Sequence, residues 1–140
     1  MSGLFRVAAE AIIEKDGKIL ITKRAAHRNH APNEWETLTG RIEQGETLEV
    51  GLKREVQEEV GLEVEVIQPF YTFHFFRGSQ KEEHLGVSFW CKYKSGQVKL
   101  NKDEQSEFQW VTVKEALTFI HDKSIKKSLL TFQKLLEKSQ

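Results

Sequence analysis

Apolar residues at the start of the chain form two short runs separated by a polar turn. Residues 5–14 are apolar and β-compatible, and residues 19–21 resume the run after a turn that contains Asp16 and Gly17. Two such runs joined by an Asp-Gly turn are typical of a β-hairpin. The sequence therefore predicts that the domain begins with a hairpin.

The segment 47–60 has a different period. It lacks proline, and its apolar residues recur every four positions, which is helical spacing. These residues are Leu48, Leu52, Val56 and Val60. Gly61 follows at once and suits the end of a helix. Gly51 is unusual inside a helix and should cost roughly 0.5–1 kcal/mol relative to alanine; close packing against a neighbouring strand would explain it.

The remaining apolar runs predict four strands and two helices. The strands are 35–38, 63–76, 85–94 and 108–111, with the second of them interrupted near Pro69, and the helices are 113–121 and 124–138. Polar loops are expected at 24–34, 40–45 and 77–83. Strands, a helix, more strands and then helices predict an α/β (α+β) fold, with a mixed sheet and helices packed against it.

Composition limits the function. The 140 residues fit a single domain spanning 1–140. Lys+Arg equals Asp+Glu at 21 each, so the basic surface expected of a long nucleic-acid binder is missing. The single cysteine, Cys91, lies in an apolar run and is expected to be a buried thiol rather than a nucleophile. The sequence shows no signal peptide and no apolar stretch long enough for a bilayer, so we expect a cytoplasmic protein without a membrane partner.

Three acids crowd the end of the predicted helix. At about 100° per residue, Glu55, Glu58 and Glu59 share a narrow sector of one helix face. Like charges so close repel each other, and a divalent cation would remove the conflict. Mg²⁺ prefers hard oxygen ligands and keeps waters, which leaves room for phosphate oxygens. Taken alone, these acids favour a solvated acidic helix face over a metal site.

A longer pattern surrounds these acids. Its fixed positions are Gly40, Glu46, Arg54, Glu55, Val56, Glu58, Glu59, Gly61 and Leu62. The spacing resembles the Nudix box, G-x5-E-x7-R-E-U-x-E-E-x-G-U with U apolar, at every fixed position over residues 40–62. The chain is thus similar to MutT-like Nudix hydrolases. This resemblance implies the Nudix fold, a mixed central β-sheet sandwiched between α-helices.

The resemblance also implies an activity. Such proteins are metal-dependent pyrophosphohydrolases, in which water attacks a phosphorus of a diphosphate linkage. The expected substrate is a nucleoside triphosphate or another nucleoside diphosphate-linked compound, and the expected cofactor is Mg²⁺, with Mn²⁺ as a substitute. A small nucleotide is therefore the expected partner, and a homodimer is a second one because many members dimerise. The sequence decides neither the substrate nor the oligomeric state.

The same resemblance implies roles for individual residues. The metal ligands would be Gly40, through its carbonyl, and Glu55, Glu58 and Glu59. These three glutamates and Arg54 form the catalytic set, in which Arg54 positions carboxylates. Which glutamate acts as the general base, and how many ions bind, stay open. The structural box positions are Gly45, Gly61 and Glu46, the last expected to cap the helix and to pair with Arg54.

Residues outside the box are less constrained. A further metal ligand is expected from the loop before Trp110, where Glu104 is favoured over Asp103 and Glu107. Arg24 ends the hairpin beside the box and is a candidate phosphate contact, with surface solvation as the equal alternative. Arg41 stands where relatives often have a second glycine, and it is the other candidate substrate contact.

Two rival functions share the fold. A prenyl-diphosphate isomerase would need a catalytic cysteine, and Cys91 is badly placed for it. A non-catalytic Nudix-like domain that binds a nucleotide usually lacks some box carboxylates, whereas this chain has all of them. Turnover of a nucleotide panel separates these readings.

Overall fold

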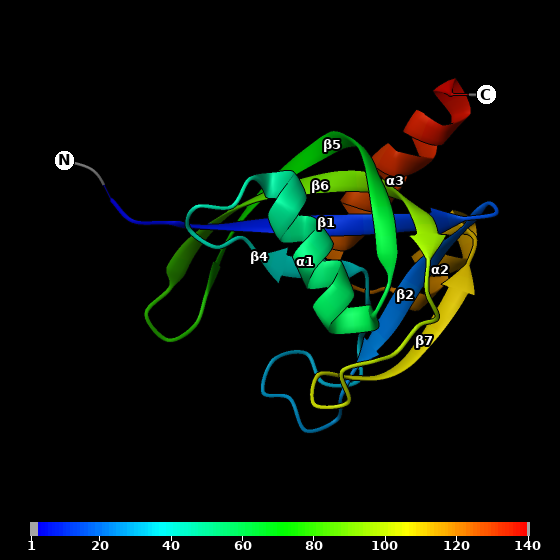
Figure 1. Ribbon diagram of the computed structural model, residues 1–140. Coiled ribbons are helices and arrows are strands. Elements are labelled where there is room, and N and C mark those ends of the chain that lie inside the picture. The colour runs from blue at the N-terminus through cyan, green and yellow to red at the C-terminus, as the bar shows by residue number, and fades with distance from the viewer. Residues whose placement is uncertain (1–2, 140) are drawn as a thin grey trace.

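The computed structural model describes residues 3–139, and it contains seven strands and three helices in one mixed sheet-and-helix arrangement (Figure 1). The strands are β1 (Arg6–Lys15), β2 (Lys18–Arg24), β3 (Trp35–Glu36), β4 (Leu38–Arg41), β5 (Glu63–Arg77), β6 (Glu82–Ser95) and β7 (Gln105–Val111). The helices are α1 (Leu48–Val60), α2 (Val113–Phe119) and α3 (Lys123–Lys138).

Strand β1 is the centre of the sheet. It pairs in parallel with β6 and antiparallel with β2 and β4, while β5 forms the edge next to β6 and β7 pairs with β2. The N-terminal hairpin, with Asp16 and Gly17 in its turn, is confirmed. The predicted mixed sheet is confirmed as well.

Helices cover both faces of this sheet, with α1 in front and α2 and α3 behind (Figure 1). Alternation along β1 separates two apolar cores, because successive side chains of a strand point to opposite faces. Ala9, Ala11 and Ile13 pack with α1, whereas Ile12 packs with α2 and α3. No helix within residues 3–139 has both the length and the apolar character needed to span a membrane.

Helix α1 occupies the predicted segment and has a defined cap at each end. The side chain of Thr47 accepts a hydrogen bond from the Val50 backbone N–H at 3.1 Å. At the other end Gly61 has a left-handed backbone with φ of 71°, and its N–H reaches the Gln57 carbonyl. The expectation that Glu46 caps the helix is wrong, because Thr47 satisfies the free backbone donor and Glu46 lies one residue earlier.

The glycine inside α1 has a packing reason. A Cβ atom on Gly51 would lie 2.8 Å from Ile42 Cδ1 and 2.9 Å from Glu46 Oε1. Both residues belong to the loop between β4 and α1, so this loop rather than a strand lies against the helix. Close packing is therefore the correct explanation, but its partner was predicted wrongly.

Some element boundaries differ from the predictions because long-range pairing extends the strands. The loop predicted to start at Gly40 starts later, since β4 continues through Gly40 opposite Ala9. Strand β5 is not interrupted at Pro69. Proline is tolerated there because β5 is an edge strand, and its register to β6 shifts on both sides of Pro69.

The other differences are small. The loop predicted at 77–83 is reduced to 78–81, and β7 starts at Gln105 because it pairs with β2 from Arg24 onwards. Helix α2 ends at Phe119, and Asp122 then caps α3 by accepting a hydrogen bond from the Ile125 N–H at 3.0 Å.

A buried carboxylate on β1 connects this strand to three other segments behind the sheet. Glu10 on β1 is 3 % exposed and accepts hydrogen bonds from the hydroxyls of Thr37, Ser88 at 2.5 Å and Ser128 at 3.1 Å. Burial raises its pKa, and the three hydroxyl donors oppose that rise. Such a satisfied polar group joins β1 to β6, to α3 and to the β3–β4 junction.

Candidate active site

Helix α1 and strand β4 meet at a glycine. A Cβ atom on Gly40 would lie 2.3 Å from Cγ, 2.5 Å from Cδ and 2.7 Å from Cβ of Glu55. The Glu55 side chain therefore lies directly over the Gly40 backbone, in a space that any larger residue would fill. This contact brings together two box positions that are fifteen residues apart in the chain.

Arg54 connects the carboxylates of the box. Its Nε and Nη2 atoms bind both oxygens of Glu46 at 2.7 and 2.9 Å. Its Nη1 atom donates to Glu55 at 3.0 Å and to Glu58 at 3.2 Å, and Nη2 also reaches the Arg41 carbonyl at 3.0 Å. The guanidinium of Arg54 lowers the pKa of Glu46 to about 2, and Glu46, followed by Glu55, raises the pKa of the guanidinium. All donors of this side chain are thus used inside the protein, which makes Arg54 a positioning residue.

Three carboxyl groups crowd the inner side of α1. Burial, and after it the neighbouring Glu104 and Glu55, raise the pKa of Glu59 to about 8. Burial also raises the pKa of Glu55. Arg54 opposes this rise, whereas the charges of Glu58 and Glu104 increase it. No ion pair to Glu59 is found in the described part of the chain. Glu55, Glu59 and Glu104 therefore form an acidic cluster in which Glu55 is paired with Arg54 at 3.0 Å, whereas Glu59 has no such partner among residues 3–139.

Backbone hydrogen bonds place Glu104 in this cluster. The loop between β6 and β7 docks on the end of α1, with Lys99 N–H donating to the Val60 carbonyl at 2.8 Å and Asn101 N–H to the Glu59 carbonyl at 3.2 Å. Figure 1 shows this loop beside the loop that follows β2, and Ala25 N–H donates to the Glu104 carbonyl at 2.8 Å. Two anchors thus direct Glu104 toward α1.

The other two candidate acids lie elsewhere. Glu107 is opposite Lys23 in the β2–β7 ladder and forms an ion pair with it at 3.3 Å. Asp103 is not among the main influences on the pKa of Glu55 or Glu59, and its N–H donates to Asn101 Oδ1 at 3.2 Å.

The side chains are not arranged as a closed metal site. Within residues 3–139, His, Cys, Asp and Glu form no group of three or more in a geometry that would hold a metal ion. Glu55 and Glu58 turn to Arg54, as described above. The donor chemistry nevertheless fits a hard divalent cation, because the cluster contains only carboxylate oxygens and concentrates negative charge.

The two arginines predicted to contact substrate have structural partners. Arg24 is only 8 % exposed, so surface solvation is wrong for it. Its Nε donates to the His30 carbonyl at 2.8 Å, and its Nη1 pairs with Glu36 at 3.2 Å. Arg41 is exposed, and its carbonyl accepts a hydrogen bond from Arg54. Arg6 lowers the pKa of Glu82 most, and the charge of Arg41 lowers it further.

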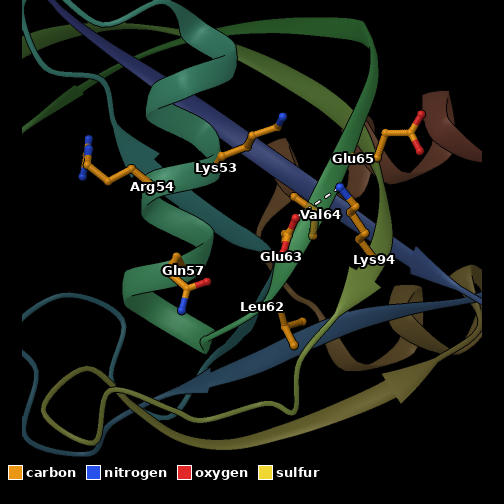
Figure 2. A pocket seen from close by; sticks show the side chains of 8 residues that line it. All are labelled: Lys53, Arg54, Gln57, Leu62, Glu63, Val64, Glu65 and Lys94. Atoms are coloured by element: carbon orange, nitrogen blue, oxygen red, sulfur yellow. Dashed lines mark ion pairs between the residues drawn. The ribbon is translucent and has the colours of Figure 1, made fainter.

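The opposite flank of α1 contains a groove of about 420 Å³ (Figure 2). Its lining residues are Lys53, Arg54, Gln57, Leu62, Glu63, Val64, Glu65 and Lys94. Lys94 pairs with Glu63 at 3.2 Å across the groove, and Figure 2 shows Arg54 extending away from this pair. Its acids are paired or exposed, so the groove does not have the chemistry of the acidic cluster.

The cysteine does not have the properties of a nucleophile. Cys91 is fully buried and free, and burial raises its pKa to about 12. A thiol in this state is protonated at neutral pH and out of reach of a substrate. This finding argues against an isomerase that depends on a catalytic cysteine.

The sequence did not mark Glu36 and Arg77 as candidate residues. Glu36 binds Arg24 Nη1 at 3.2 Å, and Arg77, the last residue of β5, has its Nη2 atom 3.5 Å from His30 Nε2. No motif in the sequence marks either residue. Their places depend on contacts between distant segments.

Comparisons with known proteins agree with this architecture. A family model for the NUDIX domain matches residues 4–132. The nucleoside triphosphatase NudI of Escherichia coli is 30 % identical over 128 residues, which cover 84 % of this chain and 89 % of NudI. The NAD-capped RNA hydrolase NudC of Vibrio parahaemolyticus is 34 % identical over 106 residues, covering 74 % of this chain but only 37 % of NudC.

Solved structures show the same fold. The E. coli ORF135 protein superposes with a TM-score of 0.75 at 26 % identity, covering 94 % of this chain and 90 % of that one. The MutT NUDIX hydrolase from Burkholderia pseudomallei superposes with a TM-score of 0.76 at 22 % identity, covering 92 % and 98 % of the two chains. With a complete box, the family match over nearly all of the chain and these neighbours, the chain belongs to the Nudix hydrolase family.

Proposed function

We propose that this protein hydrolyses the diphosphate linkage of a nucleoside triphosphate or another nucleoside diphosphate-linked compound, with Mg²⁺ as the cofactor. Glu55 and Glu59 would be the principal cation ligands, with Glu58, Glu104 and the Gly40 carbonyl as further ligands. The observation that carries the proposal is the acidic cluster of Glu55, Glu59 and Glu104, in which Glu59 forms no ion pair among the described residues.

The physical argument concerns charge. A carboxyl group with a pKa near 8 is largely protonated at neutral pH, so Glu59 is neutral when no cation is present. A bound cation would favour the ionised carboxylate and release this proton. When bound, the cation supplies charge neutralisation for the diphosphate oxygens. A reaction of this kind needs no side-chain nucleophile, which is consistent with the inert Cys91.

The protein's own residues would orient the reacting groups. Arg54 keeps Glu55 and Glu58 in place through its Nη1 atom, while Glu46 holds the other edge of the guanidinium. Glu58 is the most solvent-accessible of these acids, with 58 % of its side chain exposed. It can therefore accept a proton from an attacking water without leaving its Arg54 contact. Glu55 and Glu59 are alternative bases, and this assignment stays open.

The names of the relatives guide the choice of substrates. NudI is named a nucleoside triphosphatase and NudC an NAD-capped RNA hydrolase. The test therefore uses nucleoside triphosphates, NAD and nucleoside diphosphate sugars, each with Mg²⁺ or Mn²⁺, and measures released phosphate, pyrophosphate and nucleoside monophosphate.

Three variants decide the role of the cluster. Glu58→Gln and Glu59→Gln should each lower turnover at least 10-fold, while Glu49→Gln, which makes the same change on the exposed side of α1, should not. The proposal is wrong if no compound in the panel is hydrolysed. It is also wrong if Glu58→Gln and Glu59→Gln both retain wild-type turnover. Retained turnover would leave the Nudix fold in place but assign the reaction to other residues.

A further inference from the structure

The loop between β2 and β3 is held to Arg24 along its length. Arg24 N–H donates to the Glu34 carbonyl at 2.9 Å, and Asn33 N–H donates to the Arg24 carbonyl at 3.1 Å. The Arg24 side chain then reaches the His30 carbonyl at 2.8 Å. Arg24 therefore fixes the path of this loop through three hydrogen bonds, and its guanidinium is occupied in doing so.

Arg28 is the residue that this loop presents to the acidic cluster. Ala25 is anchored on the Glu104 carbonyl, and Arg28 N–H closes a turn onto the Ala25 carbonyl at 3.2 Å. Arg28 is half-buried. These two hydrogen bonds hold Arg28 one turn away from the backbone of Glu104, which is a member of the cluster.

Arg77 approaches the same place from the β5–β6 hairpin. Its Nη2 atom lies 3.5 Å from His30 Nε2, and its guanidinium lies over the Phe75 ring at 5.0 Å from the centroid. Burial lowers the pKa of Arg77, and the charges of Arg24 and Arg28 lower it further. Three arginines from two segments thus converge despite their mutual repulsion.

The charges at this place do not balance. Arg24 is paired with Glu36, whose pKa is raised by burial and lowered by Arg24 and Arg28. Arg28 and Arg77 form no ion pair with any residue in the range 3–139. His30 supplies no negative charge in either of its protonation states, and burial and then Arg77 lower its pKa, which favours the neutral ring. Two positive charges are therefore left without a partner beside a site that should bind a diphosphate.

We propose that Arg28 and Arg77 form a second anion subsite, independent of the metal, that binds a phosphate group of the substrate outside the linkage held at the acidic cluster. This inference rests on the proposed function and narrows its substrate class. It favours a nucleotide with a chain of three or more phosphates over a nucleoside diphosphate sugar, whose outer end carries no charge. Arg24 and Glu36 are positioning residues that hold the loop in which Arg28 lies.

The direct test measures binding without catalysis. Inorganic tripolyphosphate is titrated into the protein in EDTA by isothermal calorimetry, so that metal binding at the carboxylates does not contribute. The wild type should bind, and Arg28→Ala/Arg77→Ala should bind at least 10-fold more weakly. Lys53→Ala/Lys94→Ala removes the same charge from the opposite flank of α1 and should bind within twofold of the wild type.

Kinetics provide the second readout. The double arginine variant should raise KM for the best triphosphate at least 10-fold with kcat within about threefold, since the carboxylates are unchanged. Arg28→Ala alone should give part of this effect. This single change lies in a loop turn, so it keeps the test valid if Arg77→Ala disturbs the hairpin.

Two results would overturn the inference. One is a wild-type protein that does not bind tripolyphosphate in EDTA, and the other is a double arginine variant that binds as well as the lysine control. Either result leaves the proposed function standing as long as Glu59→Gln abolishes turnover. Conversely, the double arginine variant could lose tripolyphosphate binding while the wild type hydrolyses no nucleotide. That result would confirm the subsite and refute the proposed hydrolysis.

Discussion

A double-mutant cycle on Gly40 and Glu55 tests the central contact of the site. Gly40 is on a strand and has no positive φ, so Gly40→Ala demands no unusual backbone. The cost is steric: the new Cβ would lie 2.3 Å from Cγ and 2.7 Å from Cβ of Glu55. Those are the inner atoms of the side chain, so a simple rotation of its far end does not relieve the overlap.

The expected magnitude follows from packing. Inserting a methyl group into a filled space costs about 1–3 kcal/mol, so Gly40→Ala should lower the free energy of unfolding by about that amount. In a Glu55→Ala background Cγ and Cδ are gone and Cβ, at 2.7 Å, is the obstructing atom of this residue that remains, so the same change should cost less than in the wild type but not nothing. The two mutations should therefore couple by about 1 kcal/mol, with Glu55→Ala reducing the cost of Gly40→Ala.

The measurement is urea unfolding of the four proteins in EDTA, followed by circular dichroism. Metal is removed so that stability reports the contact alone. Gly40→Ala should also lower turnover with Mg²⁺, because Glu55 would be displaced from its place beside Arg54. The reasoning is refuted if Gly40→Ala destabilises the protein equally with and without the Glu55 side chain.

Three further predictions concern the neighbouring residues. Arg54→Lys should lower kcat at least 10-fold with little loss of stability, because an ammonium group cannot form the two parallel hydrogen bonds that the planar guanidinium makes to Glu46. Steady-state kinetics measure kcat, and thermal melts measure the stability. In EDTA, the free energy of unfolding should fall as pH rises from about 4.5 toward 8, because the raised pKa of Glu59 means that folding favours its protonated form. Urea titrations at several pH values measure this slope, and Glu59→Gln should flatten it. Gly51→Ala should change the free energy of unfolding by less than about 1 kcal/mol, because the helical gain opposes a contact with the movable end of Ile42; chemical denaturation decides it.

The sequence identified α1 and its carboxylates because both depend on local geometry. Helical spacing puts Glu55 and Glu59 on one face whatever else the chain does, and Gly61 ends the helix by its own backbone preference. The hairpin at Asp16 and Gly17 was predictable for the same reason. These features need only residues within a few positions of each other.

Only the tertiary structure decided which residues surround that helix. The place of Glu104 beside α1 depends on a loop anchored to that helix, and the place of Glu107 opposite Lys23 depends on the register of the β2–β7 ladder. Arg24 was a candidate either for a phosphate contact or for surface solvation, and only the fold shows that it is buried and bound by Glu36 and the His30 carbonyl. Backbone hydrogen bonds between distant segments make these placements, and no periodicity in the chain encodes them. The cleavage chemistry is therefore local in the sequence, whereas the surroundings that select a substrate are a property of the folded chain.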